Sequence, residues 1–463
     1  MTARYIIADV FDGLRSLPDN SVDLVFTSPP FLALRSYLPA DHPDKAREIG
    51  SEPTPAAFID TLLDVTEELA RVLAPHGSLC VELGDTYAGD RGGGTESTGQ
   101  ARRGENRAVT ADGRTVAGLN QRVAMTREGD GWPTPKSLCL IPESYRLALT
   151  YGRNPFNGRE TDPWRVRNVV RWHRPNPPVG ALGDKFRPST SDVAVACKSA
   201  KRYFDLDALR GPGSPNTHAR TAVGVESRPS TGKTADDERR GGNFSTLDTL
   251  HDTNGAPPLD TWIIPTEPYK GSHYATFPSD LVVKPVAAMC PERVCVVCGA
   301  PSRRITEQSQ ELDPSRPQAK RAMELAEAHG LTEAHISAVY ATGITDAGKA
   351  KVTMSGNGKN APEVQRLAAE AKAALGGYFR EFTMSNQVTL GWTDCGHDSW
   401  RRGVVLDPFA GSGTTLAVAT GHGRDAIGID IDSRNADLAL ERVGMFLTVD
   451  GPSALSDEGK PDV

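Results

Sequence analysis

A short stretch near the start of the chain, VFTSPPF (Val25–Phe31), ends an apolar strand on a hydroxyl, two prolines and an aromatic ring. Prolines stop a strand and fix the direction of the chain, so this tip is expected to be stiff. The hydroxyl of Ser28 and the carbonyls beside Pro29 and Pro30 could accept hydrogen bonds, and Phe31 offers a flat face for stacking. The stretch therefore suits a flat ligand with polar edges, although an ordinary strand end could have the same sequence.

A second stretch, VVLDPFAGSGTT (Val404–Thr415), is typical of a strand followed by a tight turn that opens a helix. Gly411 and Gly413 allow positive φ and a close approach of the backbone to a ligand. The turn lacks the lysine of a triphosphate-binding loop and the third glycine of a dinucleotide site. Asp430 ends the next strand, fifteen residues after Thr415, where a carboxylate can accept both hydroxyls of a ribose. The pair favours an adenosine cofactor without phosphates over a simple loop.

Four residues have the spacing of metal ligands. VCVVCGAP supplies Cys295 and Cys298 in a C-x-x-C-G turn, and DCGHD supplies Cys395 and His397 much later in the chain. Three thiolates and one imidazole would complete a closed, structural zinc tetrahedron, a zinc knuckle. Cys290 is an alternative ligand, and free thiols in a reduced protein are the alternative interpretation.

The elements that must position these residues follow a β-α-β-α-β rhythm. Strands are expected at Tyr5–Val10, Val22–Thr27 and Ser78–Leu83, and a helix at Ala56–Leu73. A further unit of strand, turn, helix, strand and helix is expected over Val404–Val443. This alternation predicts an α/β fold, a doubly wound and mostly parallel Rossmann-like sheet with irregular and helical insertions.

The same pattern divides the chain. Residues 1–85 are expected to form the catalytic-motif half, 86–135 a flexible insertion, 136–210 the remainder of that half, 211–271 a variable target-recognition region, 272–314 and 383–447 the cofactor-binding half with the zinc knuckle, 315–382 a helical insertion, and 448–463 a disordered tail. Residues 330–344 could form a helix-turn-helix, but plain amphipathic packing is favoured.

Composition narrows the class of protein. The 463 residues carry a net charge of −7, include no apolar run of transmembrane length, and contain seven cysteines, an odd number that argues against a disulfide framework. We therefore expect a cytoplasmic protein with no membrane partner. Residues 165–210 have ten Lys/Arg against four Asp/Glu, a local +6 on an otherwise acidic chain. Such a stretch suits a phosphate-facing surface, or else a solvated face.

Together the two motifs resemble the S-adenosylmethionine-dependent DNA amino-methyltransferases of the beta class, in which the catalytic motif precedes the cofactor motif. The resemblance lies in TSPPF (Thr27–Phe31), the segment Val169–Asp205, HYATFPSDLV (His273–Val282), DPFAGSGTT (Asp407–Thr415) and GIDIDSRNADLALERV (Gly428–Val443). It implies a methyltransferase sheet, S-adenosylmethionine as cofactor and double-stranded DNA as partner. A cognate restriction endonuclease is a further implied partner, whereas the choice between monomer and homodimer stays open.

The resemblance also implies roles for individual residues. Ser28, Pro29, Pro30 and Phe31 would form the catalytic tip, where the hydroxyl and the Pro29 carbonyl accept protons from an exocyclic amino group and the ring stacks on the base. The implied cofactor contacts are Gly411 and Gly413 with the methionine part, Asp407 with its ammonium, Asp430 with the ribose, Asp9 with the adenine amino group, and Phe277, Pro278, Phe409 and Thr414 along the pocket. Each carboxylate could instead cap a helix or lie at the surface.

Serine rather than aspartate at position 28 favours cytosine N4 over adenine N6 as the target within this family. A base inside a duplex cannot be reached, so it must be flipped out. The alternatives are adenine N6 methylation, methylation of RNA or of a protein glutamine, and a catalytically inactive DNA-binding homologue.

Overall fold

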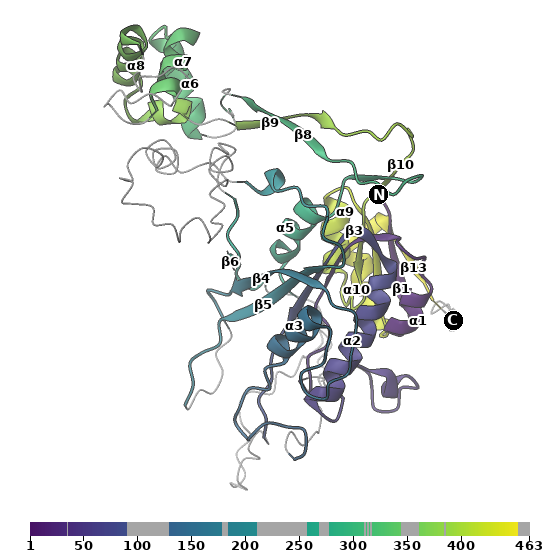
Figure 1. Cartoon of the computed structure of the whole chain (residues 1–463). Helices are drawn as coiled ribbons and strands as arrows, with labels where there is room; N and C mark the ends of the chain where they lie inside the picture. The colour runs from purple at the N-terminus through teal and green to yellow at the C-terminus, as the bar shows by residue number, and fades with distance from the viewer. Residues whose placement is uncertain are drawn as a thin grey trace, which may run out of the picture. The chain divides into compact units, whose positions relative to one another are not determined.

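The computed structural model describes residues 1–34, 36–89, 129–177, 184–210, 257–267, 277–309, 312, 314, 317–343, 361–383 and 386–451. The chain divides into two compact units. The sheet unit comprises Met1–Asp205, Leu259–Ser302 and Asp394–Val463, and the hairpin–helix unit comprises Leu206–Pro258 and Arg303–Thr393 (Figure 1). Both ends of the chain therefore belong to the sheet unit, as the motif pattern requires.

Nine strands of the described residues form one sheet in the order β13-β1-β12-β11-β2-β3-β5-β4-β6. They are β1 (Ala3–Ile7), β2 (Val22–Thr27), β3 (Leu73–Leu83), β4 (Arg165–His173), β5 (Thr190–Cys197), β6 (Thr261–Ile263), β11 (Val404–Asp407), β12 (Asp425–Asp430) and β13 (Leu447–Asp450). Neighbours from β13 to β3 are parallel, β5 is antiparallel to both of its neighbours, and β6 is parallel to β4. The predicted mostly parallel α/β fold is confirmed.

Helices cover both faces of the sheet. They are α1 (Val10–Arg15), α2 (Pro55–Val72), α3 (Ile141–Tyr151), α5 (Asp280–Met289), α9 (Thr414–Gly421) and α10 (Arg434–Val443). On β12, the side chain of Ile429 meets Gly13 of α1, while the adjacent Gly428 lies against Leu416 of α9. Successive residues of a strand point to opposite faces, so α1 and α9 lie on opposite sides and the sheet is doubly wound.

The helix α2 shows why the sequence folds this way locally. Thr54 caps its start by accepting a hydrogen bond from the backbone N–H of Ala57 at 3.2 Å, and Pro55 occupies the first turn, where no N–H is needed. Its buried stripe, which includes Phe58, Leu62 and Leu69, joins the main hydrophobic cluster. The expected helix Ala56–Leu73 is therefore present, shifted by one residue.

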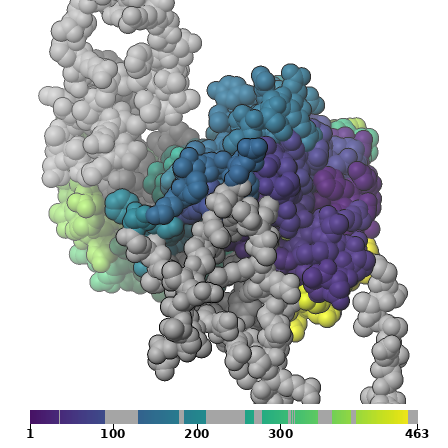
Figure 2. Space-filling model, turned by 90° about the horizontal axis from the view of Figure 1, so that it is seen from below, coloured from purple at the N-terminus to yellow at the C-terminus, as the bar shows by residue number. Residues whose placement is uncertain are grey.

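The first and last parts of the chain are neighbours in space. β1 pairs with β12 on one side and with β13 on the other, so N-terminal residues lie among C-terminal ones. In the space-filling view, the purple N-terminal surface and the yellow C-terminal surface adjoin (Figure 2). The predicted tail from residue 448 is corrected here, because residues 447–450 form β13; residues 452–463 lie outside the described part.

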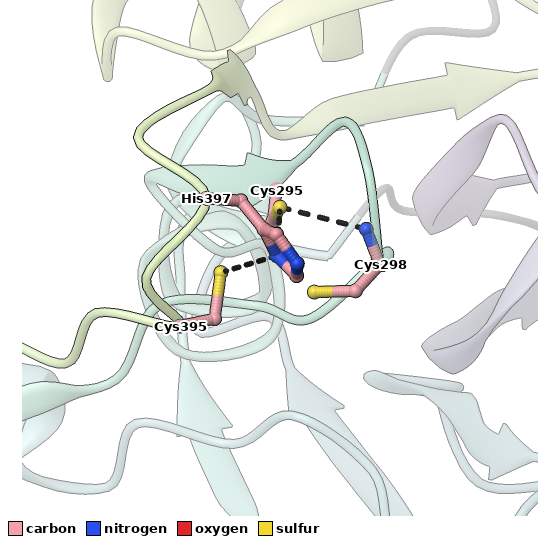
Figure 3. Close-up of side chains that lie close together, drawn as sticks. All are labelled: Cys295, Cys298, Cys395 and His397. Carbon is pink, nitrogen blue, oxygen red and sulfur yellow. Dashed lines mark hydrogen bonds between the residues drawn. The ribbon is translucent and has the colours of Figure 1, made fainter.

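Two short strands, β7 (Arg293–Cys295) and β10 (Trp400–Arg402), pair antiparallel in the sheet unit. The loop after β7 carries Cys298, and the loop before β10 carries Cys395 and His397, so these residues gather with Cys295 at one place (Figure 3). Gly403 then connects β10 directly to β11 and the Gly-rich turn.

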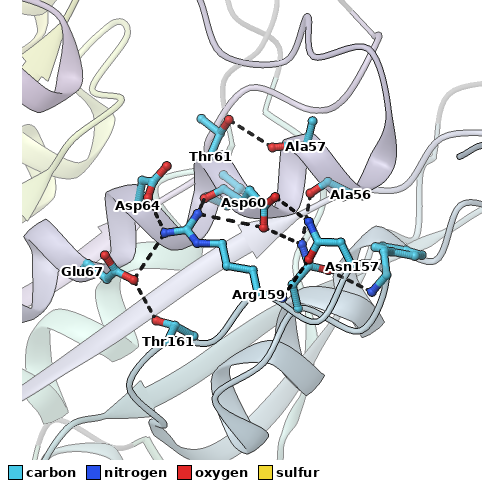
Figure 4. Close-up of polar contacts among 12 residues, drawn as sticks. Ala56, Ala57, Asp60, Thr61, Asp64, Glu67, Asn157, Arg159 and Thr161 are labelled. Carbon is cyan, nitrogen blue, oxygen red and sulfur yellow. Dashed lines mark hydrogen bonds and ion pairs between the residues drawn. The ribbon is translucent and has the colours of Figure 1, made fainter.

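A polar network fastens the loop after α3 to α2 (Figure 4). Arg159 donates to the carbonyl of Asp60 at 2.7 Å and also pairs with Asp64 and Glu67. Asn157 donates to the Asp60 carboxylate at 2.6 Å. These contacts fix the loop on the outer side of α2 and leave its apolar stripe to the sheet.

The hairpin–helix unit contains β8 (Arg304–Ser309), β9 (Asn386–Trp392), α6 (Pro317–Ala328), α7 (Glu333–Thr342), α8 (Pro362–Leu375) and the 3₁₀ helix η4 (Gly376–Thr383). Ala319, Val339, Ala371 and Leu375 form its core. The apolar side of α7 is thus used in packing, as favoured over a helix-turn-helix. The predicted limits 315–382 were too narrow, because β8 and β9 pair with each other and belong to this unit.

Two other predicted regions are only partly described. Most of the expected insertion 86–135 lies outside the described residues, as does most of the region 211–271. Within the latter, residues 261–263 form β6 at the edge of the main sheet, which the sequence did not predict. No helix in the described ranges is long and apolar enough to cross a membrane.

Candidate active site and metal cluster

The four strands β1, β12, β11 and β2 are neighbours and run parallel, so their carboxyl ends meet at one edge of the sheet. In doubly wound sheets this edge is where ligands bind. A cleft with about 850 Å³ of space, counted out to its solvent mouth, opens there. Its walls include Ser28 and Pro30 from the end of β2, Gly411 and Thr414 from the Gly-rich turn, and Asp430 from the end of β12.

The hydroxyl of Ser28 donates a hydrogen bond to a carboxylate oxygen of Glu82 at 2.7 Å. The sheet register explains this contact, because Thr27 pairs with Val81 and the following residues are therefore adjacent. Glu82 is buried, and burial raises its pKa, while hydrogen bonds from Ser28 and Ser191 oppose the rise. The contact orients the hydroxyl proton away from the cleft and leaves oxygen lone pairs available to it.

The rest of the predicted catalytic tip divides between the cleft and its support. Pro30 lines the cleft, while Pro29 is buried and does not line it. The ring of Phe31 lies against Gly84, where a Cβ atom would come within 2.4 Å of the ring carbon Cε2. Phe31 packs against the main hydrophobic cluster and is outside the cleft lining, so its predicted stacking role is not visible in this arrangement.

Asp407 is buried and does not line the cleft, although the expected contact with a cofactor ammonium would place it there. Its Oδ1 accepts from the Thr27 hydroxyl at 2.7 Å, and its Oδ2 accepts from the Thr415 hydroxyl at 2.7 Å. Burial raises its pKa to about 6, and the two hydroxyls oppose that rise. In this structure Asp407 ties the end of β2 to the start of α9, and the expected contact with a cofactor ammonium stays a prediction.

The Gly-rich turn takes the backbone conformation that its glycines permit. Gly411 has φ of +48° and donates its N–H to Asp430 at 2.8 Å, while its carbonyl accepts from the Tyr5 hydroxyl at 2.8 Å. Gly413 has φ of +75°, and a Cβ atom there would lie 3.0 Å from the Cβ of Ala439. Both positions therefore need glycine, one for the shape of the cleft wall and one for the packing of α9 on α10.

Asp430 lies at the cleft with part of its hydrogen-bonding capacity still available. Its Oδ2 accepts from Gly411, and its Oδ1 accepts from the N–H of Asp432 at 2.8 Å and from Asn435 at 3.1 Å. Burial raises its pKa to about 6. A carboxylate offers about four lone-pair sites, so Oδ2 can accept from a further donor in the cleft.

Asp9 is a helix cap, the alternative role named above for the site carboxylates. It caps α1, because its Oδ1 accepts from the N–H groups of Phe11 at 3.0 Å and Asp12 at 3.3 Å, and it pairs with Arg47 at 2.9 Å. It also lines the cleft. A contact with an adenine amino group stays a prediction.

The aromatic residues behave differently from one another. Phe277 lines the cleft and packs edge-on against Phe26, with ring centroids 5.4 Å apart. Phe409 lines it as well, and Thr414 does so while hydrogen-bonded to Arg442. Pro278 is buried and does not line the cleft; its carbonyl accepts the N–H of Leu281 at the start of α5.

Sequence reasoning missed part of the cleft. Tyr37, Glu48 and Ile49, from the segment between the SPPF tip and α2, form one wall. Ser412 also lines the cleft, and its buried hydroxyl has no hydrogen-bond partner among the described residues. Glu82 was missed too, although a glutamate inside the apolar strand SLCVEL was a signal that something must satisfy its charge.

The four predicted metal ligands lie together in the sheet unit. Their ligand atoms, three Sγ and one imidazole nitrogen, all lie within 4.8 Å of one another (Figure 3). The Nδ1 atom of His397 is 3.5 Å from the Sγ of Cys295 and 3.4 Å from that of Cys395. Cys290 is buried elsewhere and is not in the cluster, so the alternative ligand is not needed.

Comparisons with known proteins relate the chain to DNA methylases. The sequence profile of the DNA methylase family matches residues 22–297 and 397–441. The Type II methyltransferase M.SfiI of Streptomyces fimbriatus is 29% identical over 206 residues, which are 44% of this chain but only 38% of that protein. M.Cfr9I of Citrobacter freundii is 27% identical over 275 residues, covering 59% of this chain and 68% of that protein. Among solved structures, the PvuII DNA methyltransferase (cytosine-N4-specific) aligns with 96% of this chain and 86% of its own, at 11% identity and a TM-score of 0.43.

The gap in the profile match, residues 298–396, nearly coincides with the segment Arg303–Thr393 of the hairpin–helix unit. That segment is therefore an insertion in a common catalytic body. The profile covers both the SPPF tip and the Gly-rich turn, and the structure brings these two motifs to one cleft. The chain belongs to the S-adenosylmethionine-dependent DNA methylase family.

Proposed function

We propose that this protein is a site-specific DNA methyltransferase that methylates the exocyclic amino group of a flipped-out base, and that this group is N4 of cytosine. One observation carries the proposal: Ser28 and the Gly411 turn, 383 positions apart in the sequence, line the same cleft. Had the two motifs faced different surfaces, methyl transfer between their ligands would have been excluded.

The residues of the cleft fit S-adenosylmethionine. Asp430 has an acceptor oxygen available for a ribose hydroxyl, and Phe277 and Phe409 offer apolar walls. The buried hydroxyl of Ser412 has no partner within the described part of the chain, and a ligand would supply one. When bound, the cofactor supplies an electrophilic methyl group on a sulfonium centre.

The catalytic tip addresses the weak nucleophilicity of an aromatic amino group. The nitrogen lone pair of such a group is delocalised into the ring, so acceptors that take hydrogen bonds from the NH₂ favour a tetrahedral nitrogen. Ser28 can serve as such an acceptor because its own proton is already donated to Glu82. The stiff proline backbone holds this acceptor in place before the base arrives, which reduces reorganisation.

The choice of cytosine rests on the residue at position 28. Serine presents a neutral hydroxyl at the tip, and the nearby carboxylate of Glu82 lies behind it. In the family that this chain resembles, serine at this position tends to accompany cytosine N4, whereas aspartate accompanies adenine N6. Adenine N6 is therefore the alternative that the experiment must separate.

Incubation of the purified chain with duplex DNA and labelled S-adenosylmethionine, followed by digestion to nucleosides and mass spectrometry, tests the proposal. We expect N4-methyldeoxycytidine. N6-methyldeoxyadenosine would overturn the base assignment but keep the enzyme class, and label in protein or RNA alone would overturn DNA as substrate.

A matched variant distinguishes catalysis from binding. Ser28→Ala should keep cofactor binding in calorimetry, because Ser28 does not belong to the Gly-rich turn, yet lose about 10²–10³-fold in rate. If the unaltered chain itself fails to bind S-adenosylmethionine, the alternative of an inactive DNA-binding homologue gains support.

The finer partners belong to the same proposal. Within the basic stretch 165–210, Lys198 donates to the carbonyl of Ala70. Arg167, Arg171 and Arg187 are exposed, although Arg171 pairs with Asp192 and Arg187 donates to the carbonyl of Pro177. We assign DNA phosphate contact to the exposed members, with action on DNA in the cytoplasm and a cognate restriction endonuclease as partner. Binding that weakens steeply with added salt would support the phosphate contact.

A further inference from the structure

The cysteine–histidine cluster lies where the chain leaves the sheet unit and where it returns. The chain passes from the sheet unit to the hairpin–helix unit after Ser302 and comes back at Asp394. Cys295 and Cys298 stand just before the exit, and Cys395 and His397 stand just after the return. The cluster therefore brings together the two ends of a long inserted segment.

The spacing of the ligand atoms suits a tetrahedral ion. Zn–S bonds of about 2.3 Å and Zn–N bonds of about 2.0–2.1 Å place tetrahedral ligands about 3.5–3.8 Å from one another. The Nδ1 atom of His397 is 3.5 Å from one sulfur and 3.4 Å from another, and the whole set lies within 4.8 Å. Small side-chain rotations would bring all four atoms to one ion (Figure 3).

The backbone around the cluster is already shaped for such a site. The N–H of Cys298 points at the sulfur of Cys295, 3.5 Å away, and Gly299 closes the turn with φ of +68°. On the returning side, Gly396 has φ of +82° and donates to Asp394 at 2.7 Å. Two tight turns thus present their sulfur atoms to each other.

Apolar packing does not explain why these turns are ordered. Val296 and Val297, between the two cysteines of the first turn, have exposed fractions of 55% and 64%. β7 and β10 pair over only three residues each. Val294 and Cys295 of β7 are buried, but the turns beyond the ribbon have little core to stabilise them, which is the situation in which proteins use a structural metal.

We propose that Cys295, Cys298, Cys395 and His397 bind one Zn²⁺ that acts as a clasp, joining the exit and return of the inserted segment. The clasp fixes β10, whose Arg401 donates at 2.6 Å to Asp23, a buried residue of β2. β10 runs through Gly403 into β11 and the Gly-rich turn. With the clasp in place, unfolding of the inserted segment 303–393 would leave the catalytic cleft intact.

Metal analysis of the untagged, full-length protein tests the binding. We expect one zinc per chain after purification without added metal. Cys298→Ser should lose that zinc because it removes a ligand, and the change disturbs little packing because Cys298 is exposed. Cys197→Ser is the matched control, since its sulfur donates to the carbonyl of Ser199 at 3.2 Å and a hydroxyl can do the same. Absence of metal, retention of zinc by Cys298→Ser, iron in place of zinc, or a disulfide within the cluster would each overturn the proposal.

A second measurement tests the clasp itself. The zinc-free protein, prepared by chelation under reducing conditions, should gain protease cleavage sites in the turns 296–299 and 394–399, with a lower melting temperature. Added Zn²⁺ should restore both, and added Mg²⁺ should not, because hard cations prefer oxygen ligands. Identical cleavage patterns with and without zinc would refute the clasp, and this result does not depend on methyltransferase activity.

Discussion

The link between the two motifs through Asp407 offers a direct test of the structure. Thr27, at the end of β2, and Thr415, in α9, each donate a hydroxyl proton to a different oxygen of this buried carboxylate at 2.7 Å. Thr27→Val keeps the shape of the side chain and removes one donor. We expect a loss of stability that depends on the charge of Asp407, and therefore on pH.

The magnitude follows from the pKa of Asp407, which burial raises from 3.8 to about 6. A raised acidic pKa means that the folded chain holds this proton more tightly than the unfolded chain. The contribution of Asp407 to the free energy of unfolding therefore falls by about 3 kcal/mol as pH rises from about 4 to about 6, at roughly 1.4 kcal/mol per pKa unit. A hydrogen bond to a charged group contributes about 1.5–3 kcal/mol. Thr27→Val should thus cost about 2 kcal/mol at pH 8, where Asp407 is ionised, and clearly less at pH 5, where it is mostly protonated.

Urea denaturation at pH 8 and pH 5, followed by near-ultraviolet circular dichroism, measures both values. Thr420→Val is the matched control, since this buried hydroxyl of α9 donates to the neutral carbonyls of Leu416 and Ala417. The control should lose about 1 kcal/mol at either pH. Equal losses for Thr27→Val at the two pH values would refute the assignment of a charged Asp407 as the link.

Three further outcomes are expected. Gly84→Ala should displace the ring of Phe31, with which its Cβ would collide at 2.4 Å, lowering kcat/KM for DNA while the Kd for S-adenosylmethionine stays unchanged; weaker cofactor binding would argue otherwise. Glu82→Gln should lower the rate and remove the acid limb of its pH profile, because burial raises the pKa of Glu82 and protonation of that carboxylate disturbs its contact with Ser28; an unchanged profile would exclude this role. Arg401→Met should destabilise the fold by about 3–5 kcal/mol, measured by urea denaturation, since it leaves the buried Asp23 with fewer partners; Asp23→Asn in the same chain should recover part of the loss, and no recovery would count against the pairing.

The sequence predicted the sheet and the two motifs well because their signals are local. A strand that ends in SPPF, or a strand followed by Gly411 and Gly413, needs no knowledge of distant residues to be identified. Asp430 was placed by its distance along one β-α-β unit, which is also a local signal. Cys295 and Cys298, which we propose as metal ligands, were identified in the same way, from their spacing.

Contacts that depend on strand order could not be predicted from spacing alone. Glu82 meets Ser28 only because β3 is placed beside β2 in a particular register. Asp407 sits in the expected motif, yet its carboxylate faces Thr27 because β11 is the other neighbour of β2. β13 has only four positions, of which Leu447 alone is buried, too few for a periodic signal, so its residues from 448 on were assigned to the tail.

The placement of β1 between β12 and β13 has a consequence for synthesis of the protein. β12 and β13, the two sheet neighbours of β1, follow it in the chain only after all the inserted segments, so they are translated much later. The backbone N–H and C=O groups of β1 therefore have no strand partner until the insertions have been translated. An unpaired strand edge is prone to wrong association. Chaperone dependence during translation is the expected result, and it would come from strand order rather than from weak packing.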